Sequence, residues 1–414
     1  MRPVLVQDSF DNMRSGDLRF LQEAARLGPV HVLLLSDELA ASQSGQAPKF
    51  PRPSVYELLL VEYSRTQDPT TLDMVVRSVD AMIDGGIYDQ VGGGFHRYST
   101  DERWLVPHFE KMLYDNAQLA RVYLHAWQVT GNEFYRTITE EILDYVVREM
   151  TDPAGGFYST QDADSEGVEG KFFVWTPDEI RAVLDGGADA FMAAYAVTRH
   201  GNFEGKSILE FVGDMDQRSG LAVARHKLYD VREGRIHPGR DEKILTSWNG
   251  LMLAAFAEAA RALDREDYCR VAERNADFLL CELRQENGRL HRTWKARPEQ
   301  VEGSGEAKLN GYLEDYSYLI EGLLELYQTS FDPRWFVAAR ELAETMIAHY
   351  QSPDGGFFDT SDDHEALITR PRDLQDNATP SGNGVATTAL LKLAGLTNDM
   401  RYVGISQRSL EQMQ

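Results

Sequence analysis

The chain has 414 residues, of which 43% are hydrophobic and 26% are charged, with 42 Lys and Arg against 66 Asp and Glu. This composition is typical of a globular protein with a large core. The net charge of −24 argues against nucleic acid or an anionic membrane as the main partner, because both require a concentrated basic surface.

Cysteine usage and hydropathy show no sign of export or membrane insertion. Cys269 and Cys281 match neither a disulfide framework nor a CxxC or metal spacing, so we interpret them as buried small hydrophobic residues. No apolar run reaches the roughly 18 residues of a membrane span. The first residues also lack the basic and apolar regions of a signal peptide. We therefore expect a cytoplasmic protein.

The first 45 residues predict a small α/β segment. Val4–Val6 and Val30–Leu35 have the composition of buried strands, and Asp17–Leu27 has the apolar spacing of an amphipathic helix. Residues 45–48 then interrupt the pattern with Gly and Pro. We therefore expect two domains, residues 1–45 and residues 46–414.

From Pro53 onward the sequence predicts helical hairpins. Four hairpins are complete, one around residues 177–200 is less regular, and the second helix of a sixth ends with the chain. A Gly-Gly-Phe turn recurs at residues 155–157 and 355–357. The turns of the four complete hairpins are Asp68-Pro69, Gly131-Asn132, Asp264-Arg265 and Asp332-Pro333.

Polar residues open the first helix of successive hairpins, about sixteen residues before each turn. Sixteen helical residues span about 24 Å, so these residues should share one end of a bundle. A period of about 65 residues is too long for TPR or HEAT repeats. We therefore predict a mainly α fold, an (α/α)6 barrel with a truncated last hairpin and a pocket at its polar mouth. The helix-opening residues are Asp115, Asn249, Asp315 and Asn383.

The main candidate site is the dense polar and aromatic stretch from Tyr88 to Asn116. Glycines allow close backbone approach, and aromatic faces suit the apolar face of a sugar. His and carboxylate side chains can transfer protons near neutral pH. The alternative is a buried hairpin junction whose polar groups only cap helices. The candidate catalytic residues are His96, His108 and Glu110, and the candidate substrate-binding residues are Tyr88, Arg97, Trp104 and Asp115.

Further candidates lie in an acidic loop and at later helix starts. The loop at 161–167 resembles the start of an EF-hand, but Phe173 occupies the position of the bidentate Glu, so we expect no metal and no cofactor. A solvated turn explains this loop equally well, and each helix-start residue alone is more simply a cap. These candidates are Asp162 and Asp164 in the loop, Asp315 as a second catalytic carboxylate, and Trp248, Asn249 and Asn377 as substrate-binding residues.

From residue 46 to its end the chain resembles the helical domain of the thioredoxin-domain-containing family typified by spermatogenesis-associated protein twenty. The resemblance implies a six-hairpin barrel like those of N-acylglucosamine 2-epimerase and the six-hairpin glycosidases. It also implies a role in carbohydrate metabolism, and in this chain residues 1–45 take the place of the family's thioredoxin-like domain. The matching blocks are residues 47–54, 85–120, 155–175, 247–250 and 377–384.

Residues 1–45 resemble the start of a cytidylyltransferase of the glycerol-phosphate type. That family needs an HxGH motif, and here its two histidine positions hold Arg14 and Asp17. We therefore expect no nucleotidyl transfer and interpret the segment as a remnant.

Three functions remain open at this point. The first is a sugar epimerase or isomerase with His108 as the base, supported by Glu110 or His96. The second is a glycoside hydrolase that pairs the carboxylates of Asp164 and Asp315. The third is a non-catalytic barrel that binds a glycan or a partner. The sequence favours a sugar ligand over nucleic acid or membrane, and it leaves the oligomeric state open.

Overall fold

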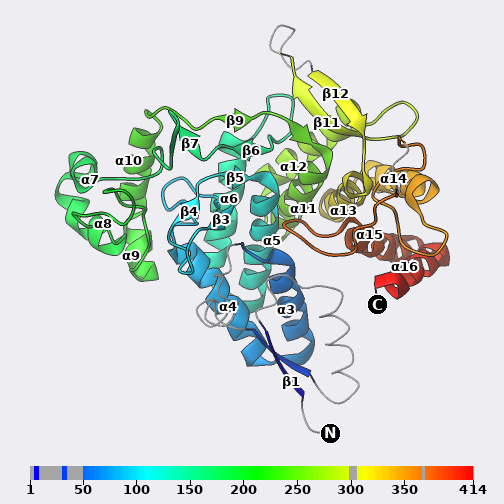
Figure 1. The fold of residues 1–414 in the computed structure, drawn as a ribbon, viewed down its shortest axis with the longest axis horizontal. Helices are drawn as coiled ribbons and strands as arrows, with labels where there is room; N and C mark the ends of the chain where they lie inside the picture. The colour runs from blue at the N-terminus through cyan, green and yellow to red at the C-terminus, as the bar shows by residue number, and fades with distance from the viewer. Residues whose placement is uncertain (1–3, 9–29, 35–49, 298–304, 366–368, 414) are drawn as a thin grey trace. The chain divides into compact units, whose positions relative to one another are not determined.

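The computed structural model describes residues 4–8, 30–34, 50–297, 305–365 and 369–413. It is mainly helical and divides into two units (Figure 1). Unit 1 comprises residues 1–33, 151–159 and 242–414, and unit 2 comprises residues 34–150 and 160–241. Within the described ranges, no helix has the length and hydrophobicity needed to cross a bilayer.

Unit 2 contains two regular helical hairpins that follow the predicted turns. The first helices of the two hairpins, α3 and α5, contact each other. Asp68 and Asn132 cap the second helices by accepting hydrogen bonds from the backbone N–H groups two residues later. The helices are α3 (Pro53–Thr66) with α4 (Pro69–Asp84), and α5 (Leu113–Thr130) with α6 (Glu133–Glu149).

The irregular hairpin expected around residues 177–200 is a group of short helices. Thr176 and Asp214 open two of them with capping boxes, so local hydrogen bonds rather than long apolar stripes define their starts. Their apolar residues pack into a separate core that includes Trp175, Phe191 and Tyr195. The helices are α7 (Pro177–Leu184), α8 (Ala188–Ala194), α9 (Met215–Gly220) and α10 (Ala222–Arg232).

Two-residue strands fix the loops of unit 2. They form a β3–β4 pair, a β7–β8 pair and a three-stranded sheet in the order β5-β6-β9, and all of these pairings are antiparallel. The strands are β3 (Tyr98–Ser99), β4 (Pro107–His108), β5 (Lys111–Met112), β6 (Thr160–Gln161), β7 (Asp164–Ser165), β8 (Val168–Glu169) and β9 (Arg240–Asp241).

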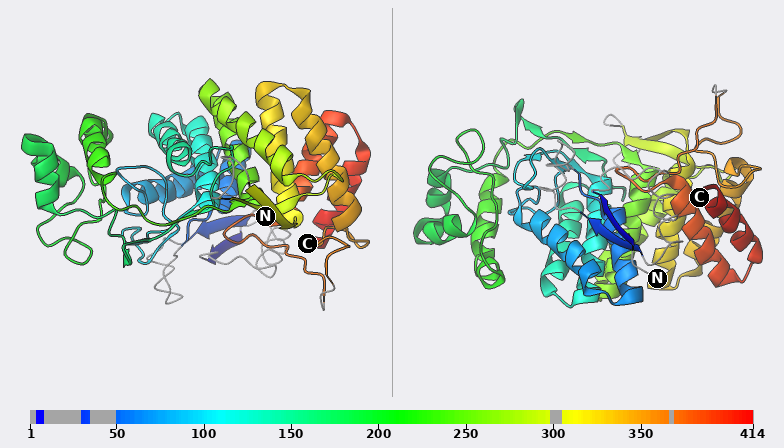
Figure 2. Two further views of the ribbon diagram at one scale, coloured as in Figure 1. Left: turned by 90° about the horizontal axis from the view of Figure 1, so that it is seen from above. Right: turned by 60° about the horizontal axis from the view of Figure 1, so that its bottom comes forward.

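Unit 1 contains three helical hairpins in sequence. The first helices form a continuous row, because α11 contacts α13 and α13 contacts α15 (Figures 1 and 2). The last hairpin has both helices, the second with 14 residues against 18 in α14. The pairs are α11 (Thr246–Leu263) with α12 (Glu266–Phe278), α13 (Leu313–Ser330) with α14 (Pro333–Tyr350), and α15 (Gly382–Thr397) with α16 (Met400–Met413).

Strands complete unit 1. β10 (Ile244–Leu245), β11 (His291–Ala296) and β12 (Gly305–Asn310) form an antiparallel sheet in that order. β1 (Val4–Asp8) and β2 (Val30–Leu34) form a two-stranded sheet, which confirms the two predicted N-terminal strands. The helix expected between them and the domain boundary at residue 45 lie outside the described residues.

A recurring clamp explains the Gly-Gly-Phe repeat. In each copy an Asn side chain near the start of a first helix accepts a hydrogen bond from the Phe N–H and donates one to the same Phe carbonyl. A Cβ on Gly155 or Gly355 would lie within 3 Å of a backbone carbonyl oxygen of α12 or α16, and both glycines have positive φ, so glycine is required. The pairs are Asn116 with Phe95, Asn249 with Phe157, and Asn383 with Phe357.

The clamp also shows that the four polar residues predicted at helix starts do not occupy equivalent positions. Asn249 and Asn383 hold the clamp position, whereas Asp115 comes one residue before it. In α13 the position after Asp315 is occupied by Tyr316, whose hydroxyl oxygen accepts a hydrogen bond from the Leu290 N–H. The four predicted residues therefore have two different structural environments.

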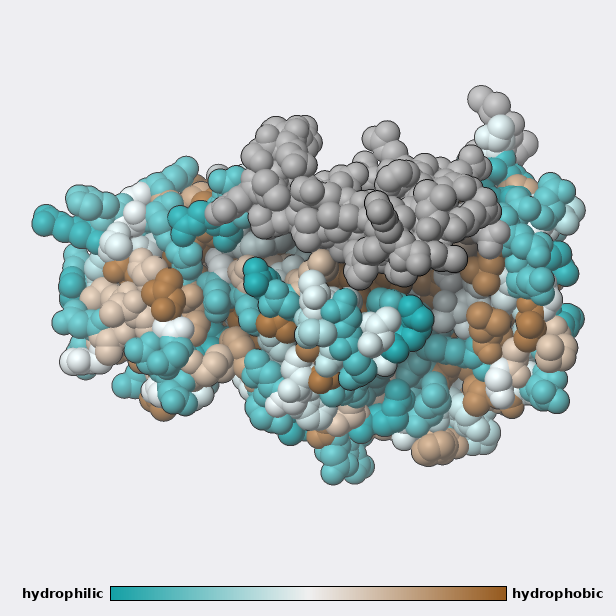
Figure 3. Space-filling model, turned by 90° about the horizontal axis from the view of Figure 1, so that it is seen from below, coloured by the Kyte–Doolittle hydropathy of each residue, from teal (hydrophilic) through white to brown (hydrophobic). Residues whose placement is uncertain are grey.

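Exposed apolar side chains are scattered. Leu58 and Val61 on α3 and Val223 on α10 are each more than half exposed. The face drawn in Figure 3 shows apolar residues in small groups among polar ones. Isolated apolar side chains of this kind are ordinary on folded proteins and do not define a docking surface.

Candidate functional site

The β3–β4 hairpin of unit 2 carries a partly exposed histidine on an aromatic stack. His108 in β4 pairs with Tyr98 in β3, and their rings stack with centroids 5.1 Å apart. Phe50 extends the stack, with its ring centroid 4.8 Å from that of Tyr98. The His108 side chain is 30% exposed, so its ring is supported by the hairpin and still reachable by a ligand.

Two carboxylates face the two nitrogens of His108. Its Nδ1 lies 2.7 Å from Oε1 of Glu169, and its Nε2 lies 3.8 Å from Oε2 of Glu110. Oε1 of Glu169 also accepts a hydrogen bond from the Phe109 N–H. A carboxylate at Nδ1 holds the ring orientation and the tautomer in which Nε2 can take up a proton. The arrangement suits a general base.

Arg97 and Asp115 complete this group, which we call the His108 cluster: Arg97, His108, Glu110, Asp115 and Glu169. Arg97 Nη1 lies 3.0 Å from Glu110 Oε2. Asp115 is 5% exposed, and its Oδ2 has no hydrogen-bond partner among the described residues. Burial raises the pKa of Asp115 well above its usual value, against the opposing charge of Arg97.

A buried ion network lies next to the cluster in sequence and in space. Lys111 Nζ and Arg232 Nη1 each lie 2.8 Å from a carboxylate oxygen of Asp89, and all three side chains are at most 4% exposed. Burial lowers the pKa of Lys111 to about 8, against the charge of Asp89. Arg232 and Lys111 hold the pKa of Asp89 well below its usual value, although burial alone would raise it.

Three predicted site residues of unit 2 are core residues. His96, Tyr88 and Trp104 are 1%, 1% and 5% exposed. His96 Nδ1 lies 2.9 Å from the Phe109 carbonyl oxygen, and burial together with Lys111 lowers the pKa of His96 to about 3. His96 and Tyr88 line a cavity of about 20 Å³, which has room for about one water molecule. A sugar in solution cannot reach these side chains.

The acidic loop provides exposed carboxylates. Asp162 and Asp164 are both exposed, and Asp162 Oδ1 accepts a hydrogen bond from the Asp164 N–H at 3.3 Å. This is the geometry of a solvated turn. Glu169, on the strand that pairs with the Asp164 strand, is the member of this segment that contacts His108.

In unit 1 the predicted site residues are mostly tied to backbone groups. Asp315 is fully buried and accepts hydrogen bonds from the Ser247 and Tyr312 N–H groups, with Arg292 3.3 Å away. Asn249 is also fully buried, with its amide occupied by the Phe157 clamp and by Leu245 and Asn275. Trp248 is half-buried and Asn377 is exposed.

Asp315 should make the stability of the chain depend on pH. Burial raises its pKa to about 6, opposed by Arg292. Between about pH 4 and 6 the folded chain keeps a proton that the unfolded chain releases, so the free energy of unfolding falls as the pH rises. Asp315→Asn should lose less stability than the wild type across this window, by an amount on the order of 2 kcal/mol. Urea unfolding from pH 4 to 7 measures it, and parallel profiles would contradict the assignment.

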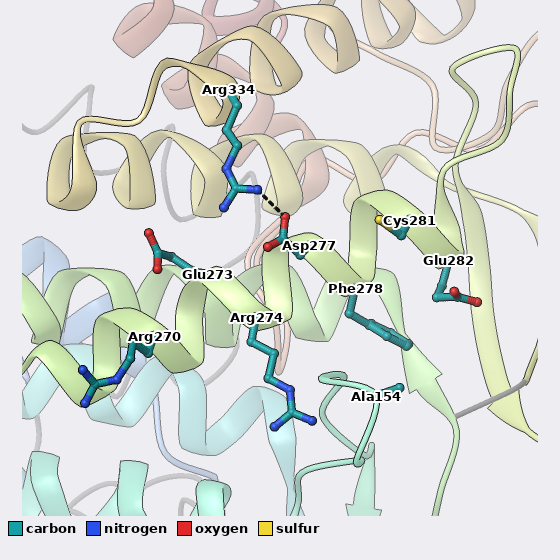
Figure 4. Close-up of a pocket in the computed structure, with 9 residues that line it drawn as sticks. All are labelled: Ala154, Arg270, Glu273, Arg274, Asp277, Phe278, Cys281, Glu282 and Arg334. Carbon is teal, nitrogen blue, oxygen red and sulfur yellow. Dashed lines mark hydrogen bonds and ion pairs between the residues drawn. The ribbon is translucent and has the colours of Figure 1, made fainter. Parts of the chain in front are cut away.

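A charged groove of about 480 Å³ lies along α12 of unit 1 (Figure 4). Asp277 and Arg334 form an ion pair there at 2.7 Å, and Arg274 points toward the loop of Ala154. Cys281 also lines the groove and is exposed, contrary to the burial expected for both cysteines, and Cys269 is half-buried. None of the predicted site residues lines this groove.

One group of described residues has the spacing of metal ligands. Glu149, Glu233 and His237 place ligand atoms within 4.8 Å of one another. Arg148 and Arg232 already lie within 3.9 Å of these carboxylates, which leaves little net negative charge for a cation. We therefore assign no metal to it.

Sequence reasoning missed Glu169, Asp89 and Arg232. Glu169 is 61 residues from His108, and Arg232 is 143 residues from Asp89. Glu169 and Asp89 lie in the blocks that carry the family resemblance, which was the available signal for them. No local pattern pointed to Arg232, because its partner comes from a distant loop.

Comparison with known proteins supports the fold class. No family model matches the chain. Human spermatogenesis-associated protein 20 is 35% identical over 397 residues, covering 85% of this chain and 50% of that protein, and the rat protein is 36% identical with the same coverage. The chain thus spans about half the length of the curated relatives it matches. The cytidylyltransferase resemblance of residues 1–45 finds no support in these comparisons.

Two solved structures with similar folds are carbohydrate-active enzymes. Cellobiose 2-epimerase from Bacillus thermoamylovorans aligns with a TM-score of 0.54 at 9% identity, over 87% of this chain and 74% of that one. A family 105 glycoside hydrolase from C. acetobutylicum aligns with a TM-score of 0.51 at 10% identity, over 87% and 75%. The chain is therefore homologous to spermatogenesis-associated protein 20 and has the fold of the (α/α)6 glycosidases and epimerases.

Proposed function

We propose that the His108 cluster binds a reducing sugar and moves a proton at the carbon next to its carbonyl group. The observation that carries this proposal is the partly exposed His108 ring, held between two carboxylates on an aromatic stack. The fold shared with a cellobiose 2-epimerase supports a sugar as the ligand. The free cysteines favour a cytoplasmic location.

In this proposal His108 Nε2 removes the proton from the sugar carbon, and the electron pair moves onto the carbonyl to give an enediolate. Glu169 accepts the Nδ1–H and stabilises the imidazolium ion that forms. Arg97, which lies 3.0 Å from Glu110, can donate a hydrogen bond to the enediolate oxygen. Delivery of a proton to the opposite face of the same carbon completes epimerisation, and delivery to the neighbouring carbon completes isomerisation.

The other two hypotheses rest on weaker observations. His96 takes no part in the proposed chemistry, because it is buried and neutral. The hydrolase pair Asp164 and Asp315 combines an exposed turn residue with a buried carboxylate that already accepts hydrogen bonds from two backbone N–H groups and Arg292. The third hypothesis, a non-catalytic binding module, is separated from an enzyme by the exchange experiment that follows.

Solvent-deuterium exchange tests the proposal. The full chain is incubated in D₂O with a panel of reducing mono- and disaccharides, and loss of the C2 proton signal is followed by NMR. We expect exchange for at least one sugar, a fall to the protein-free rate in His108→Gln, and a 10- to 100-fold reduction in Glu169→Gln. His125→Gln is the matched control, because His125 also contacts a glutamate, with its Nδ1 2.7 Å from Glu57.

Two outcomes would count against an epimerase. Exchange that survives in His108→Gln would place the base elsewhere. A sugar that raises the melting temperature of the wild type but shows no exchange would indicate a binding module. The exchange rate of Glu169→Gln at saturating sugar separates positioning from folding, because loss of the contact should slow exchange while the melting temperature and the sugar affinity stay unchanged.

A further inference from the structure

A second cavity of unit 2 is lined by cationic side chains. It has a volume of about 320 Å³ and lies between α6 and α10 against the loop of Gly92. Arg148, Arg225 and His226 line it, together with Tyr229 and Glu141. None of these residues belongs to the His108 cluster. In a chain with a net charge of −24, a cavity with this lining needs a specific explanation.

The two guanidinium groups are anchored along one edge each. Arg148 donates from Nη2 to the Gly92 carbonyl at 2.6 Å and from Nε to Glu149 at 3.0 Å. Arg225 donates from Nε to the Gln90 carbonyl at 2.8 Å and from Nη2 to Glu141 at 2.6 Å. In both residues Nη1 has no acceptor in the described part of the chain. A guanidinium fixed in this way offers its remaining N–H groups to an oxyanion at little entropic cost.

Tyr229 supports this arrangement. The Arg148 guanidinium carbon lies 4.7 Å from the centroid of the Tyr229 ring, and the Tyr229 hydroxyl donates to Glu149 at 2.9 Å. The side chain of Arg148 is 37% exposed and that of Arg225 is 12% exposed. One arginine is therefore accessible at the opening, and the other lies deeper.

Ion pairs surround the cavity. Glu141 is shared by Arg218 and Arg225, at 3.0 and 2.6 Å. Beneath the cavity Asp89 is shared by Lys111 and Arg232 in the same way. Arg148 with Glu149, and Arg232 with Glu233, complete these ion pairs, and Nε2 of His226 lies 3.8 Å from Asp230 at the opening. The two Nη1 groups, and not an excess of cations, are what the cavity offers to an anion.

We propose that this cavity binds the phosphoryl group of a small phosphorylated molecule. Three terminal oxygens in tetrahedral geometry can accept hydrogen bonds from the Nη1 groups of both arginines, and His226, 76% exposed at the opening, can add a third donor. The volume is near the lower limit for ligand pockets, which fits a phosphoryl group with a small attached body. The proposal is independent of the chemistry proposed for His108.

Calorimetric titration of the full chain at constant ionic strength tests it, with inorganic phosphate, glucose 6-phosphate and succinate as probes. We expect phosphate or its ester to bind and succinate to bind more weakly. Arg148→Gln should weaken phosphate binding at least tenfold, and the control Arg77→Gln, on an exposed face of α4, should leave it unchanged. A tighter ester indicates an organic phosphate, and equal affinities indicate free phosphate.

A second measurement keeps the proposal testable if Arg148→Gln does not fold. Phenylglyoxal modification of the wild-type chain, mapped by mass spectrometry, should be slowed at Arg148 by phosphate and unaffected at Arg77. The proposal is overturned by the absence of both heat and protection, by equal phosphate affinity in Arg148→Gln, or by succinate binding as tightly as phosphate.

Discussion

Replacing Asp89 with Asn is expected to lower the free energy of unfolding by about 3–5 kcal/mol. The carboxylate is the shared partner of Lys111 and Arg232, and the three side chains are nearly inaccessible to solvent. Asn keeps the size of the side chain and can still accept from the Val91 and Gly92 N–H groups. The substitution therefore removes mainly the negative charge and leaves two buried cations without their partner.

Urea unfolding followed by circular dichroism measures this loss. Asp73→Asn is the control, because Asp73 forms an ion pair with Arg77 at 2.8 Å but is 54% exposed, and its loss should cost less than about 1 kcal/mol. Lys111→Met and the double variant complete a cycle, in which the second substitution should cost less once the first is present. A change below 1 kcal/mol in Asp89→Asn would show that the network does not hold unit 2 together.

The same network limits what can be inferred from residue types. Lys111 follows Glu110 directly in the sequence, and both are charged residues beside a candidate histidine. The Lys111 side chain is 1% exposed and forms a structural ion pair, whereas Glu110 faces the Nε2 of His108. Their difference comes from Asp89 and Arg232, which approach only in the folded chain. Residue type and spacing therefore singled out the segment but could not separate its buried ion-paired lysine from the glutamate beside His108.

The fold was more predictable than the site, because residues close together in the sequence determine each helical hairpin. A turn such as Asp332-Pro333 combines an N-cap with a proline at the first helical position, and the flanking apolar stripes have helical spacing. The segment with α7 to α10 was less predictable, since its helices have 6 to 11 residues and their apolar residues join a separate core. Short amphipathic segments carry too few turns to define a period.

Asn249 also shows that residue type alone does not reveal whether a polar residue binds a ligand or supports the fold. Asn249 was nominated for substrate binding because it is a polar residue at a helix start, and the structure gives its amide a full set of backbone and side-chain partners. The repeat of the Gly-Gly-Phe turn indicates this structural role, because each copy is followed by the first helix of a hairpin with an Asn at its clamp position. A residue that recurs with a structural turn is more simply explained by that turn.

Asn249→Leu should test this structural role, with an expected loss of about 3–5 kcal/mol in the free energy of unfolding. Leu has the same branching at Cγ but no polar atoms, so the change leaves the Phe157 N–H and carbonyl and the Leu245 carbonyl without their side-chain partner. Each buried polar group that loses its partner costs about 1–3 kcal/mol. Urea unfolding of unit 1 is the measurement, with tryptophan fluorescence as the probe.

The control for this prediction is Asn287→Leu, in the turn between Arg284 and Leu290. Asn287 accepts one hydrogen bond, from the Arg289 N–H at 2.9 Å, and it is exposed, so water replaces the lost contact and the cost should stay below about 1 kcal/mol. Equal losses in the two variants would mean that the clamp contributes no more than an ordinary surface turn. A large loss at Asn249 alone would show that the polar helix start serves the repeat.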